Sequence, residues 1–374
     1  MPHSPHQTTY LALGSNRGDK MHWLQQSVKL IFEHIGNITA VSKIYKTPAW
    51  GFEGNDFLNA CIEVSTRLSA EKTLEKLLRI EEELGRVRSK NGYDNRNIDL
   101  DIVFFGNEQK QDKNLTVPHP KMSERRFVLA PLADIAPDLI HPIKKQSISE
   151  LLQKTSDRSE IEETKEKLEI PKLSLEGLNH LAIEGVIGAG KSSLTRMIAE
   201  DFNGKPVLER FKDNPFLPKY YKEPQRYAFA LEMSFLAERY QQFIDHTGQY
   251  ELFHDFVISD YDFNKSMIFA EITLQPEELL LYKKLFQIIH KNLPRPDLYV
   301  YLYQTTDRLL ENIKKRGRDY EQNISAEYLE KLNKRYLEFI KSQSTLNIKI
   351  IDISELNFVK NREDYLMVLR EIVS

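Results

Sequence analysis

Gly185-Val186-Ile187-Gly188-Ala189-Gly190-Lys191-Ser192 is the stretch that decides the fold of the second half of this 374-residue chain. It matches the pattern G-x-x-x-x-G-K-[ST], with a strand pattern (His180–Glu184) before it and a helical pattern after it. In that setting backbone N–H groups surround phosphate oxygens, the lysine neutralises the β- and γ-phosphates, and the serine hydroxyl coordinates Mg²⁺. The stretch therefore predicts an ATP site; an ordinary glycine turn is the alternative. The expected ATP-binding residues are Gly185, Gly188, Ala189, Gly190, Lys191, Ser192 and Ser193, and Ser192 is also an expected metal ligand.

Strands and helices alternate beyond this stretch. Strand patterns at residues 256–259, 298–302 and 348–353 are separated by helical patterns at 277–290, 307–315 and 326–341. Alternation of this kind predicts an α/β fold in which helices cover both faces of a parallel sheet.

Two further segments of the second half carry candidate catalytic residues. Glu209 lies where the next strand should end, and a carboxylate there could accept a hydroxyl proton during phosphoryl transfer; a surface glutamate is the alternative. Arg316 and Arg318 follow a basic helix and could fold over the transferring phosphate. For these arginines the alternative is an exposed helix C-terminus, which favours cations.

Residues 179–374 resemble the deoxyribonucleoside kinases, particularly the bacterial deoxyadenosine/deoxyguanosine kinase branch. The resemblance implies that Glu209 is the general base for the sugar 5′-hydroxyl, that Tyr221 and Glu321 hold the 3′-hydroxyl, and that the two arginines form a lid. It also implies a homodimer through this half. The matching stretches are Ile183–Lys191, Asn214–Leu217, Tyr221–Pro224, Ser259–Tyr261, Pro294–Leu298 and Arg316–Gln322.

The second half departs from that family pattern at two places. Many relatives have Glu/Asp-Arg-Ser where this chain has Ser259-Asp260-Tyr261, so the arginine expected near the 5′-oxygen is missing, while Asp260 keeps a carboxylate that could assist Mg²⁺ or the phosphates. Glu232 stands where many relatives have a glutamine that binds the base. An ionised carboxylate only accepts hydrogen bonds, which suits the amino group of adenine and opposes O6 of guanine. We therefore expect deoxyadenosine to be preferred over deoxyguanosine.

In the first half the informative segment is Arg96-Asn97-Ile98-Asp99-Leu100-Asp101. Side chains alternate along a strand, so Asp99 and Asp101 share one face. Two carboxylates this close repel each other unless a cation lies between them, and Mg²⁺ with ATP phosphates would satisfy the pair. The alternative is an exposed polar strand face. Arg86, Arg88 and Arg96 form a nearby basic set suited to phosphate contacts.

Residues up to about Pro142 resemble 6-hydroxymethyl-7,8-dihydropterin pyrophosphokinase, which moves pyrophosphate from ATP to a pterin alcohol. The motifs are Leu13–Asn16, Lys46–Pro48, Phe57–Ala60, Gly85–Arg88, Asp99–Asp101, Thr116–His119 and Arg125–Phe127. The resemblance implies that Asp99 and Asp101 bind two Mg²⁺ ions and that Arg86 and Arg96 act in catalysis. It places Thr47, Pro48, Asn59 and Phe127 around the pterin. It assigns ATP contacts to Glu81, Arg86, Arg88, Arg96, Thr116, His119 and Arg125. The loop at residues 90–95 departs from the family, because Gly92 occupies the position where an arginine is expected.

Composition limits the remaining possibilities. Lys+Arg number 52 and Asp+Glu 55, and this near-balance argues against a general binder of duplex DNA. The single cysteine, Cys61, excludes a disulfide within the chain. The sequence contains no apolar run long enough for a transmembrane span, and a cytoplasmic protein is expected.

The predicted architecture has two domains. Residues 1–143 are expected to form a ferredoxin-like α+β pyrophosphokinase domain, residues 144–178 a charged linker, and residues 179–374 an α/β P-loop kinase domain. The predicted function is a bifunctional Mg²⁺- and ATP-dependent transferase that acts on small molecules. Two alternatives stay open: the second half is a nucleoside monophosphate kinase, or one half is a degenerate binding or dimerising module.

Overall fold

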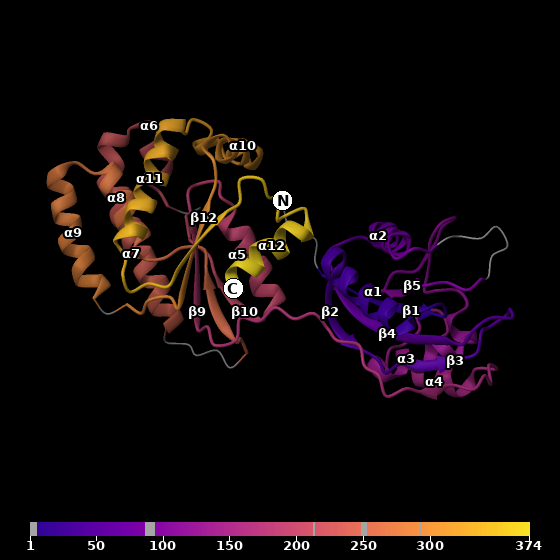
Figure 1. The fold of residues 1–374 in the computed structure, drawn as a ribbon. Helices are drawn as coiled ribbons and strands as arrows, with labels where there is room; N and C mark the ends of the chain where they lie inside the picture. The colour runs from indigo at the N-terminus through magenta and orange to yellow at the C-terminus, as the bar shows by residue number, and fades with distance from the viewer. Residues whose placement is uncertain (1–5, 87–93, 212–213, 248–252, 292) are drawn as a thin grey trace. The chain divides into compact units, whose positions relative to one another are not determined.

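The chain divides into two compact units, residues 1–172 and 173–374. A computed structural model describes residues 6–86, 94–211, 214–247, 253–291 and 293–374. Figure 1 shows each unit as a sheet covered by helices. Among the described residues, no helix combines the length and apolar character needed to cross a bilayer.

The first unit is built on an antiparallel sheet. Strand β1 (Gln7–Ser15) pairs on one side with β4 (Phe57–Thr66) and on the other with β5 (Asp99–Phe105). The sheet order is β5-β1-β4-β3-β8, with β2 also paired to β4. The other strands are β2 (Gly36–Val41), β3 (Tyr45–Thr47), β6 (Lys110–Gln111), β7 (Thr116–Val117) and β8 (Glu162–Glu163), and the helices are α1 (Lys20–His34), α2 (Ala70–Glu83), the 3-10 helix η1 (Met122–Glu124), α3 (Arg126–Ile135) and α4 (Ile148–Lys154).

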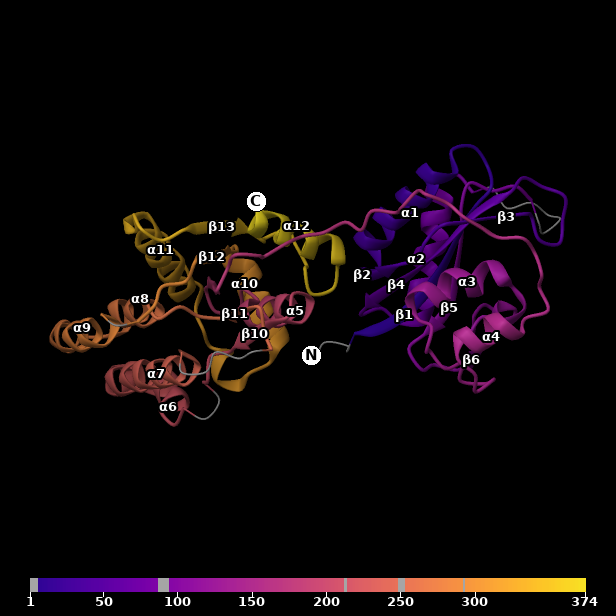
Figure 2. The same cartoon turned by 90° about the horizontal axis from the view of Figure 1, so that it is seen from below.

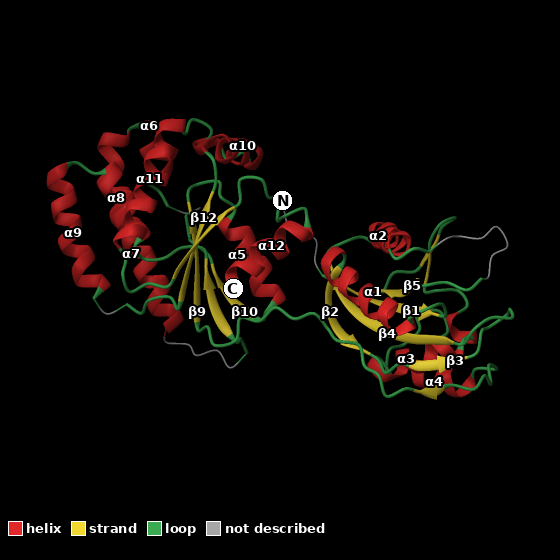
Figure 3. Cartoon of the chain, in the orientation of Figure 1, coloured by secondary structure: helices red, strands yellow, loops and turns green. Residues whose placement is uncertain are grey.

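Helices cover both faces of this antiparallel sheet, and an α+β fold is confirmed. Figure 3 shows α1 and α2 on one face and α3 with α4 on the other. Helix α2 begins after Ser69, whose hydroxyl accepts a hydrogen bond from the Lys72 N–H, and ends at Glu83, two residues before Gly85, which has φ of 79°. Serine before a helix and glycine after it are residue types that commonly mark helix ends. On the α3 face, Cys61, Val103 and Leu129 belong to one buried apolar cluster, so the cysteine is a core residue.

The prediction of a linker at residues 144–178 is wrong for most of that range, because residues up to Lys172 belong to the first unit. Helix α4 has a complete capping box and buries Ile148 and Leu151 against α3. Strand β8 then pairs with β3 at the edge of the sheet. The charged composition misled the prediction, since a few buried apolar side chains and edge-strand hydrogen bonds suffice to fix a polar segment.

The second unit contains the predicted parallel sheet, in the order β10-β11-β9-β12-β13. Figures 1 and 2 both show α5 and α12 on one side of this sheet and α7, α8, α9 and α11 on the other. The strands are β9 (His180–Gly185), β10 (Gly204–Val207), β11 (Phe256–Ser259), β12 (Leu298–Tyr303) and β13 (Ile348–Asp352). The helices are α5 (Lys191–Asp201), α6 (Leu217–Lys222), α7 (Pro224–Thr247), α8 (Lys265–Thr273), α9 (Pro276–His290), α10 (Thr306–Arg316), the 3-10 helix η2 (Asp319–Glu321), α11 (Ala326–Ser342) and α12 (Arg362–Val373).

The glycine-rich stretch joins β9 to α5, which is the predicted strand-loop-helix setting. Gly190 is the residue before the helix and has φ of 85°, a left-handed conformation that glycine adopts without steric cost. Gly188 has φ of 92°, and a Cβ there would lie 2.9 Å from the Leu309 carbonyl oxygen. Both glycines are therefore required by the backbone path of the loop.

Candidate active sites

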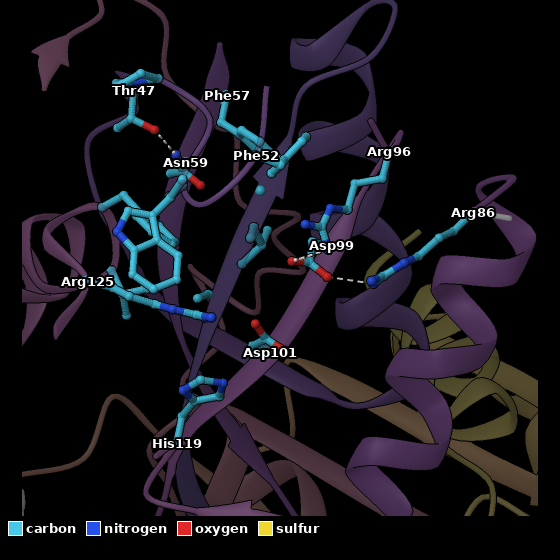
Figure 4. Close-up of a pocket in the computed structure, with 18 residues that line it drawn as sticks. Thr47, Phe52, Phe57, Asn59, Arg86, Arg96, Asp99, Asp101, His119 and Arg125 are labelled. Carbon is cyan, nitrogen blue, oxygen red and sulfur yellow. Dashed lines mark hydrogen bonds and ion pairs between the residues drawn. The ribbon is translucent and has the colours of Figure 1, made fainter. Parts of the chain in front are cut away.

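The first unit has a cavity of about 250 Å³ on the α3 side of the sheet. In Figure 4, Thr47 and Asn59 lie on one side of it and Asp99, Arg86 and Arg96 on the other. It brings together nearly all of the side chains that the sequence assigned to pterin, phosphates and metal. Its lining residues include Gly14, Thr47, Pro48, Trp50, Phe52, Phe57, Asn59, Arg86, Arg96, Asp99, Asp101, His119, Arg125 and Phe127.

Strand register places the two predicted metal ligands beside β1. Asp99 is opposite Gly14 and Asp101 is opposite Ala12, while Gly14 is in turn opposite Asn59 on β4. A Cβ on Gly14 would lie 3.0 Å from Asn59 Oδ1 and 3.9 Å from Asp99 Cβ. The absence of a side chain at this position therefore leaves room between the amide and the carboxylates.

The two aspartates differ in their surroundings. Asp99 forms ion pairs with Arg86 at 2.6 Å and Arg96 at 3.0 Å. Burial, together with the negative charge of Asp99, raises the pKa of Asp101 to about 7. A cation bound between the two side chains would relieve this repulsion. The pair therefore fits the demands of Mg²⁺, which typically binds one or two carboxylates plus phosphate oxygens and water.

The described residues contain no group of three or more His, Cys, Asp and Glu side chains arranged to hold a metal ion. Protein ligands alone would therefore leave an ion at Asp99 and Asp101 incompletely coordinated. ATP phosphates and water are the ligands that could complete its shell.

The other end of the cavity is lined by an amide and aromatic rings. The Asn59 side-chain amide donates to Thr47 Oγ1 at 2.8 Å, and this bond orients Asn59. The ring centres of Phe127 and Trp50 are 6.4 Å apart. The rings of Phe52 and Phe57 meet edge to face, with their centres 6.3 Å apart. A flat heterocycle with polar edges suits such a site, because the rings offer faces for packing and the amide offers a donor and an acceptor.

Sequence reasoning missed Trp50, Phe52 and Phe57 as lining residues. Phe57 is part of a motif that was used for the resemblance, and the other two follow Thr47-Pro48 closely. Their closeness to that motif was the available signal. Only the folded chain shows that the three rings line the cavity.

Arg125 and His119 add charge and hydrogen-bonding capacity to the cavity. The Arg125 guanidinium lies 5.2 Å from the Trp50 ring centre and 5.6 Å from that of Phe127. Burial and the charge of Arg125 lower the pKa of His119 to about 4, so the imidazole is neutral at pH 7. The Lys121 N–H donates to His119 Nδ1 at 3.2 Å, which leaves Nε2 as the protonated donor of the neutral ring.

Two predicted ATP contacts of the first half, Glu81 and Thr116, are not among the described residues that line this cavity. Glu81 is buried, pairs with Arg86 and accepts a hydrogen bond from the Leu100 N–H at 2.8 Å, so it supports the strand that carries the aspartates. Thr116 lies on β7 outside the lining set. Arg88 and Gly92 fall outside the described residues.

In the second unit, Lys191 and Ser192 lie at the start of α5 as predicted. The Lys191 ammonium donates to the carbonyl oxygens of Gly185 at 2.8 Å and Val186 at 3.2 Å, across the loop. Burial and the charge of Lys265 lower the pKa of Lys191 to about 8. The Ser192 hydroxyl donates to Asp260 Oδ2, which brings the expected metal ligand of the loop into contact with the carboxylate that follows β11. A hydroxyl and a carboxylate in this arrangement fit a Mg²⁺ ion that is also bound by phosphates.

Glu209 follows β10 and lies next to this pair. The Arg239 guanidinium binds Glu209 Oε1 through two nitrogens at 3.0 and 2.6 Å, and the Lys265 ammonium lies 2.6 Å from Oε2. Burial opposes ionisation of Glu209, but the charges of Lys265 and Arg239 hold its pKa well below the usual range. Neither cation was singled out from the sequence. Arg239 follows Glu232 by seven residues on the same face of α7, which was the only available signal.

The expected nucleoside-binding residues occupy two places in the second unit. Tyr221 stacks on Tyr320 with ring centres 5.9 Å apart. Glu321 pairs with Arg316 and, at 3.0 Å, with Arg318, so the predicted lid arginines meet on a predicted sugar ligand.

Glu232 is buried on α7. Its Oε1 accepts a hydrogen bond from the Thr273 hydroxyl at 3.0 Å, whereas within the described part of the chain Oε2 has no hydrogen-bond partner. Burial raises the pKa of Glu232 to about 7, although Arg239 counteracts the effect. Near neutral pH the Glu232 carboxyl group is therefore partly protonated, because removal from water disfavours the charged form.

Comparison with known proteins assigns each half separately. The family model described as 7,8-dihydro-6-hydroxymethylpterin-pyrophosphokinase (HPPK) matches residues 10–137, and the model described as deoxynucleoside kinase matches residues 181–374. The 2-amino-4-hydroxy-6-hydroxymethyldihydropteridine pyrophosphokinase of Bacillus subtilis (strain 168) is 46% identical over 128 residues, which cover 34% of this chain and 76% of that protein.

Two relatives match the second half. The deoxyguanosine kinase of Bacillus subtilis (strain 168) is 38% identical over 189 residues, covering 50% of this chain and 91% of that protein. The deoxyadenosine kinase of Dictyostelium discoideum is 34% identical over 212 residues, covering 55% of this chain and 83% of that protein. The first half of the chain therefore belongs to the HPPK family and the second half to the deoxynucleoside kinase family.

Proposed function

We propose that the chain is a bifunctional ATP-dependent transferase. Its first unit transfers pyrophosphate from ATP to 6-hydroxymethyl-7,8-dihydropterin, and its second unit phosphorylates the 5′-hydroxyl of a deoxynucleoside. The observation that carries the first activity is the cavity that holds Thr47, Asn59 and Phe127 at one end and Asp99 with Asp101 at the other. The contact of Ser192 with Asp260 beside Glu209 carries the second.

In the first unit, the residues divide into a pterin end and a phosphate end. Asn59 and the aromatic rings would bind the pterin and direct its hydroxymethyl group toward Asp99 and Asp101. Those carboxylates would hold Mg²⁺, which neutralises phosphate charge when bound. Arg86, Arg96, Arg125 and neutral His119 would donate hydrogen bonds to phosphate oxygens. Catalysis then depends mainly on holding the pterin oxygen in line with the β-phosphate.

In the second unit, the glycine-rich loop and Lys191 would hold the ATP phosphates, and Ser192 with Asp260 would hold Mg²⁺. Glu209 would accept the proton of the 5′-hydroxyl, and Tyr221 with Glu321 would bind the 3′-hydroxyl. Glu232 would bind the base. We propose purine deoxynucleosides as substrates, with deoxyadenosine preferred when Glu232 is ionised.

The proposal includes two further assignments. The order of the antiparallel strands and the alternation of strands and helices support a ferredoxin-like arrangement for the first unit. A homodimer through the second unit is supported by α9, which exposes Leu280, Leu281 and Ile288. Side chains of this size in one helix are candidates for contact with another copy of the chain. Replacing Leu281 and Ile288 with glutamate should then give a monomer in analytical ultracentrifugation.

Direct assay of both reactions tests the proposed function. The purified chain with ATP, Mg²⁺ and the pterin alcohol should produce AMP, and with a deoxynucleoside it should produce ADP. The four deoxynucleosides and their monophosphates are compared as acceptors. Failure to form AMP contradicts the first activity, and phosphorylation of monophosphates alone contradicts the second. A clear preference for thymidine would contradict the assignment to purines.

A further inference from the structure

Both carboxylate oxygens of the proposed base Glu209 are occupied by cations. Arg239 binds Oε1 and Lys265 binds Oε2, at 2.6 Å in each case for the closest nitrogen. All three side chains are largely removed from water, so the charge interactions are strong. A sugar hydroxyl that donates its proton to Glu209 needs one of these oxygens. Oε1 already accepts two hydrogen bonds from Arg239, so the 5′-hydroxyl approaches Oε2, where it competes with Lys265.

The contacts of the two cations indicate which one moves. Arg239 is fixed by two nitrogens on Glu209 and by a third that donates to the Ser266 hydroxyl at 2.6 Å. Lys265 makes a single hydrogen bond to Glu209, and its ammonium also lies 5.7 Å from the Phe269 ring centre. A lysine side chain has four rotatable bonds and a compact charge, so it can change partner at a smaller cost than the bidentate arginine.

Lys265 is also close to the phosphate-binding loop. Its positive charge is one cause of the lowered pKa of Lys191, whose ammonium lies across the glycine-rich stretch. Lys265 is the first residue of α8 and lies four positions after Tyr261. Tyr261 belongs to the segment Ser259-Asp260-Tyr261, which lacks the arginine expected near the 5′-oxygen. Lys265 can supply positive charge at that place.

We propose that Lys265 is a catalytic residue of the second unit, whose ammonium releases Glu209 when the 5′-hydroxyl binds and then contacts the transferring phosphoryl group. This inference rests on the proposed kinase function. In the step itself the 5′-oxygen forms a bond to the γ-phosphorus, and the bond from that phosphorus to the β–γ bridging oxygen breaks. The hydroxyl proton passes to Glu209, and ADP leaves with the electron pair of the broken bond. Lys265 stabilises the negative charge on the phosphoryl oxygens.

The test compares K265M and K265R with the unchanged chain, in steady-state assays with deoxyadenosine, deoxyguanosine and ATP. K265M removes the charge and should lower kcat about 100-fold, with the KM for the deoxynucleoside changed by less than about threefold. K265R restores a cation, and its kcat should be at least about tenfold higher than that of K265M. The matched control is Lys331→Met on α11, which removes an exposed lysine paired with Glu327 and should change neither constant. AMP formation by the first unit measures the concentration of intact protein in every sample.

A double substitution separates contact with phosphate from simple neutralisation of Glu209. If Lys265 contacts the phosphoryl group, adding K265M to Glu209→Gln should lower kcat further. If Lys265 only balances the charge of Glu209, the second change will have no effect, and the proposal is overturned. A kcat for K265M within threefold of the unchanged chain also overturns it. So does a loss confined to the KM for the deoxynucleoside, which would place Lys265 at the base or sugar. An unchanged chain that phosphorylates no deoxynucleoside contradicts the proposed function itself and this inference with it.

Discussion

The backbone N–H of Glu209 donates a hydrogen bond to Asp260 Oδ1 at 2.6 Å. These residues follow the paired strands β10 and β11, whose last residues, Val207 and Ser259, are in register. Asp260 Oδ2 meanwhile accepts from Ser192. One carboxylate thus links the glycine-rich loop to the proposed general base. The link lies at the carboxyl ends of the parallel strands, where α/β folds commonly bind their ligands.

Replacing Asp260 should separate its two roles. Asp260→Asn keeps an acceptor for the Glu209 N–H but removes the negative charge, so we expect the Mg²⁺ concentration for half-maximal phosphorylation to rise at least about tenfold. Asp260→Ala also releases Glu209 and should lower kcat a further tenfold or more at saturating Mg²⁺. Rates measured across a Mg²⁺ titration check both effects. Equal behaviour of the two variants would argue against the positioning role.

Substitutions of Asp99 and Lys191 should separate the two activities. Asp99→Asn removes half of the proposed metal pair and should abolish AMP formation while ADP formation from deoxynucleosides is kept. Lys191→Ala should have the opposite effect, because it removes the charge that holds the β- and γ-phosphates in the second unit. The two assays on one preparation serve as controls for each other. Loss of both activities by either substitution would contradict separate sites.

The purine preference should depend on pH. The pKa of Glu232 is raised to about 7, so the carboxyl group is mainly neutral below that pH and mainly ionised above it. The neutral acid can donate to O6 of guanine, and the ionised form can accept from the amino group of adenine. The ratio of kcat/KM for deoxyadenosine to that for deoxyguanosine should therefore rise about tenfold from pH 6 to pH 8.

Groups around Glu232 set the midpoint of that change. Arg239 and Lys265 favour its ionised form, Glu209 disfavours it, and Thr273 donates to it. The control is Glu232→Gln, in which an amide replaces the titrating group, and the ratio should no longer change with pH. If this ratio does not change with pH in the unchanged chain, protonation of Glu232 does not affect the choice between adenine and guanine.

The segment after residue 143 should contribute to the stability of the first unit. Asp157 Oδ2 accepts a hydrogen bond from the N–H of Arg126, the first residue of α3, at 2.8 Å. Because a carboxylate at a helix N-terminus satisfies a free donor, Asp157→Ala should cost about 1 kcal/mol of stability. Thermal inactivation of AMP formation measures the effect, and ADP formation in the same chain provides the internal reference. The exposed neighbour Ser156 is the control: Ser156→Ala should change nothing, and equal losses from both would contradict a capping role.

Local sequence patterns alone determined several features of this protein: helix ends, the phosphate-binding turn and the strand face that carries the two aspartates. Ser69 and Gly85 mark the ends of α2, and the glycine spacing before Lys191 specifies a phosphate-binding turn, because both depend on backbone conformations and hydrogen bonds within a few residues. Alternation along β5 likewise put Asp99 and Asp101 on one face. The family motifs then named most of the residues that the cavity brings together.

Tertiary structure alone decided which residues, distant in the sequence, contact the residues of those motifs. Lys265 and Glu209 are 56 positions apart, and their contact follows from the packing of α8 beside the sheet edge. The charged segment around Glu163 becomes a sheet edge only because β3 offers unpaired backbone groups there. The protonation of Glu232 is set by how much water the surrounding helices exclude. Burial and charge interactions sum over the whole fold, and therefore a residue's sequence neighbours do not determine them.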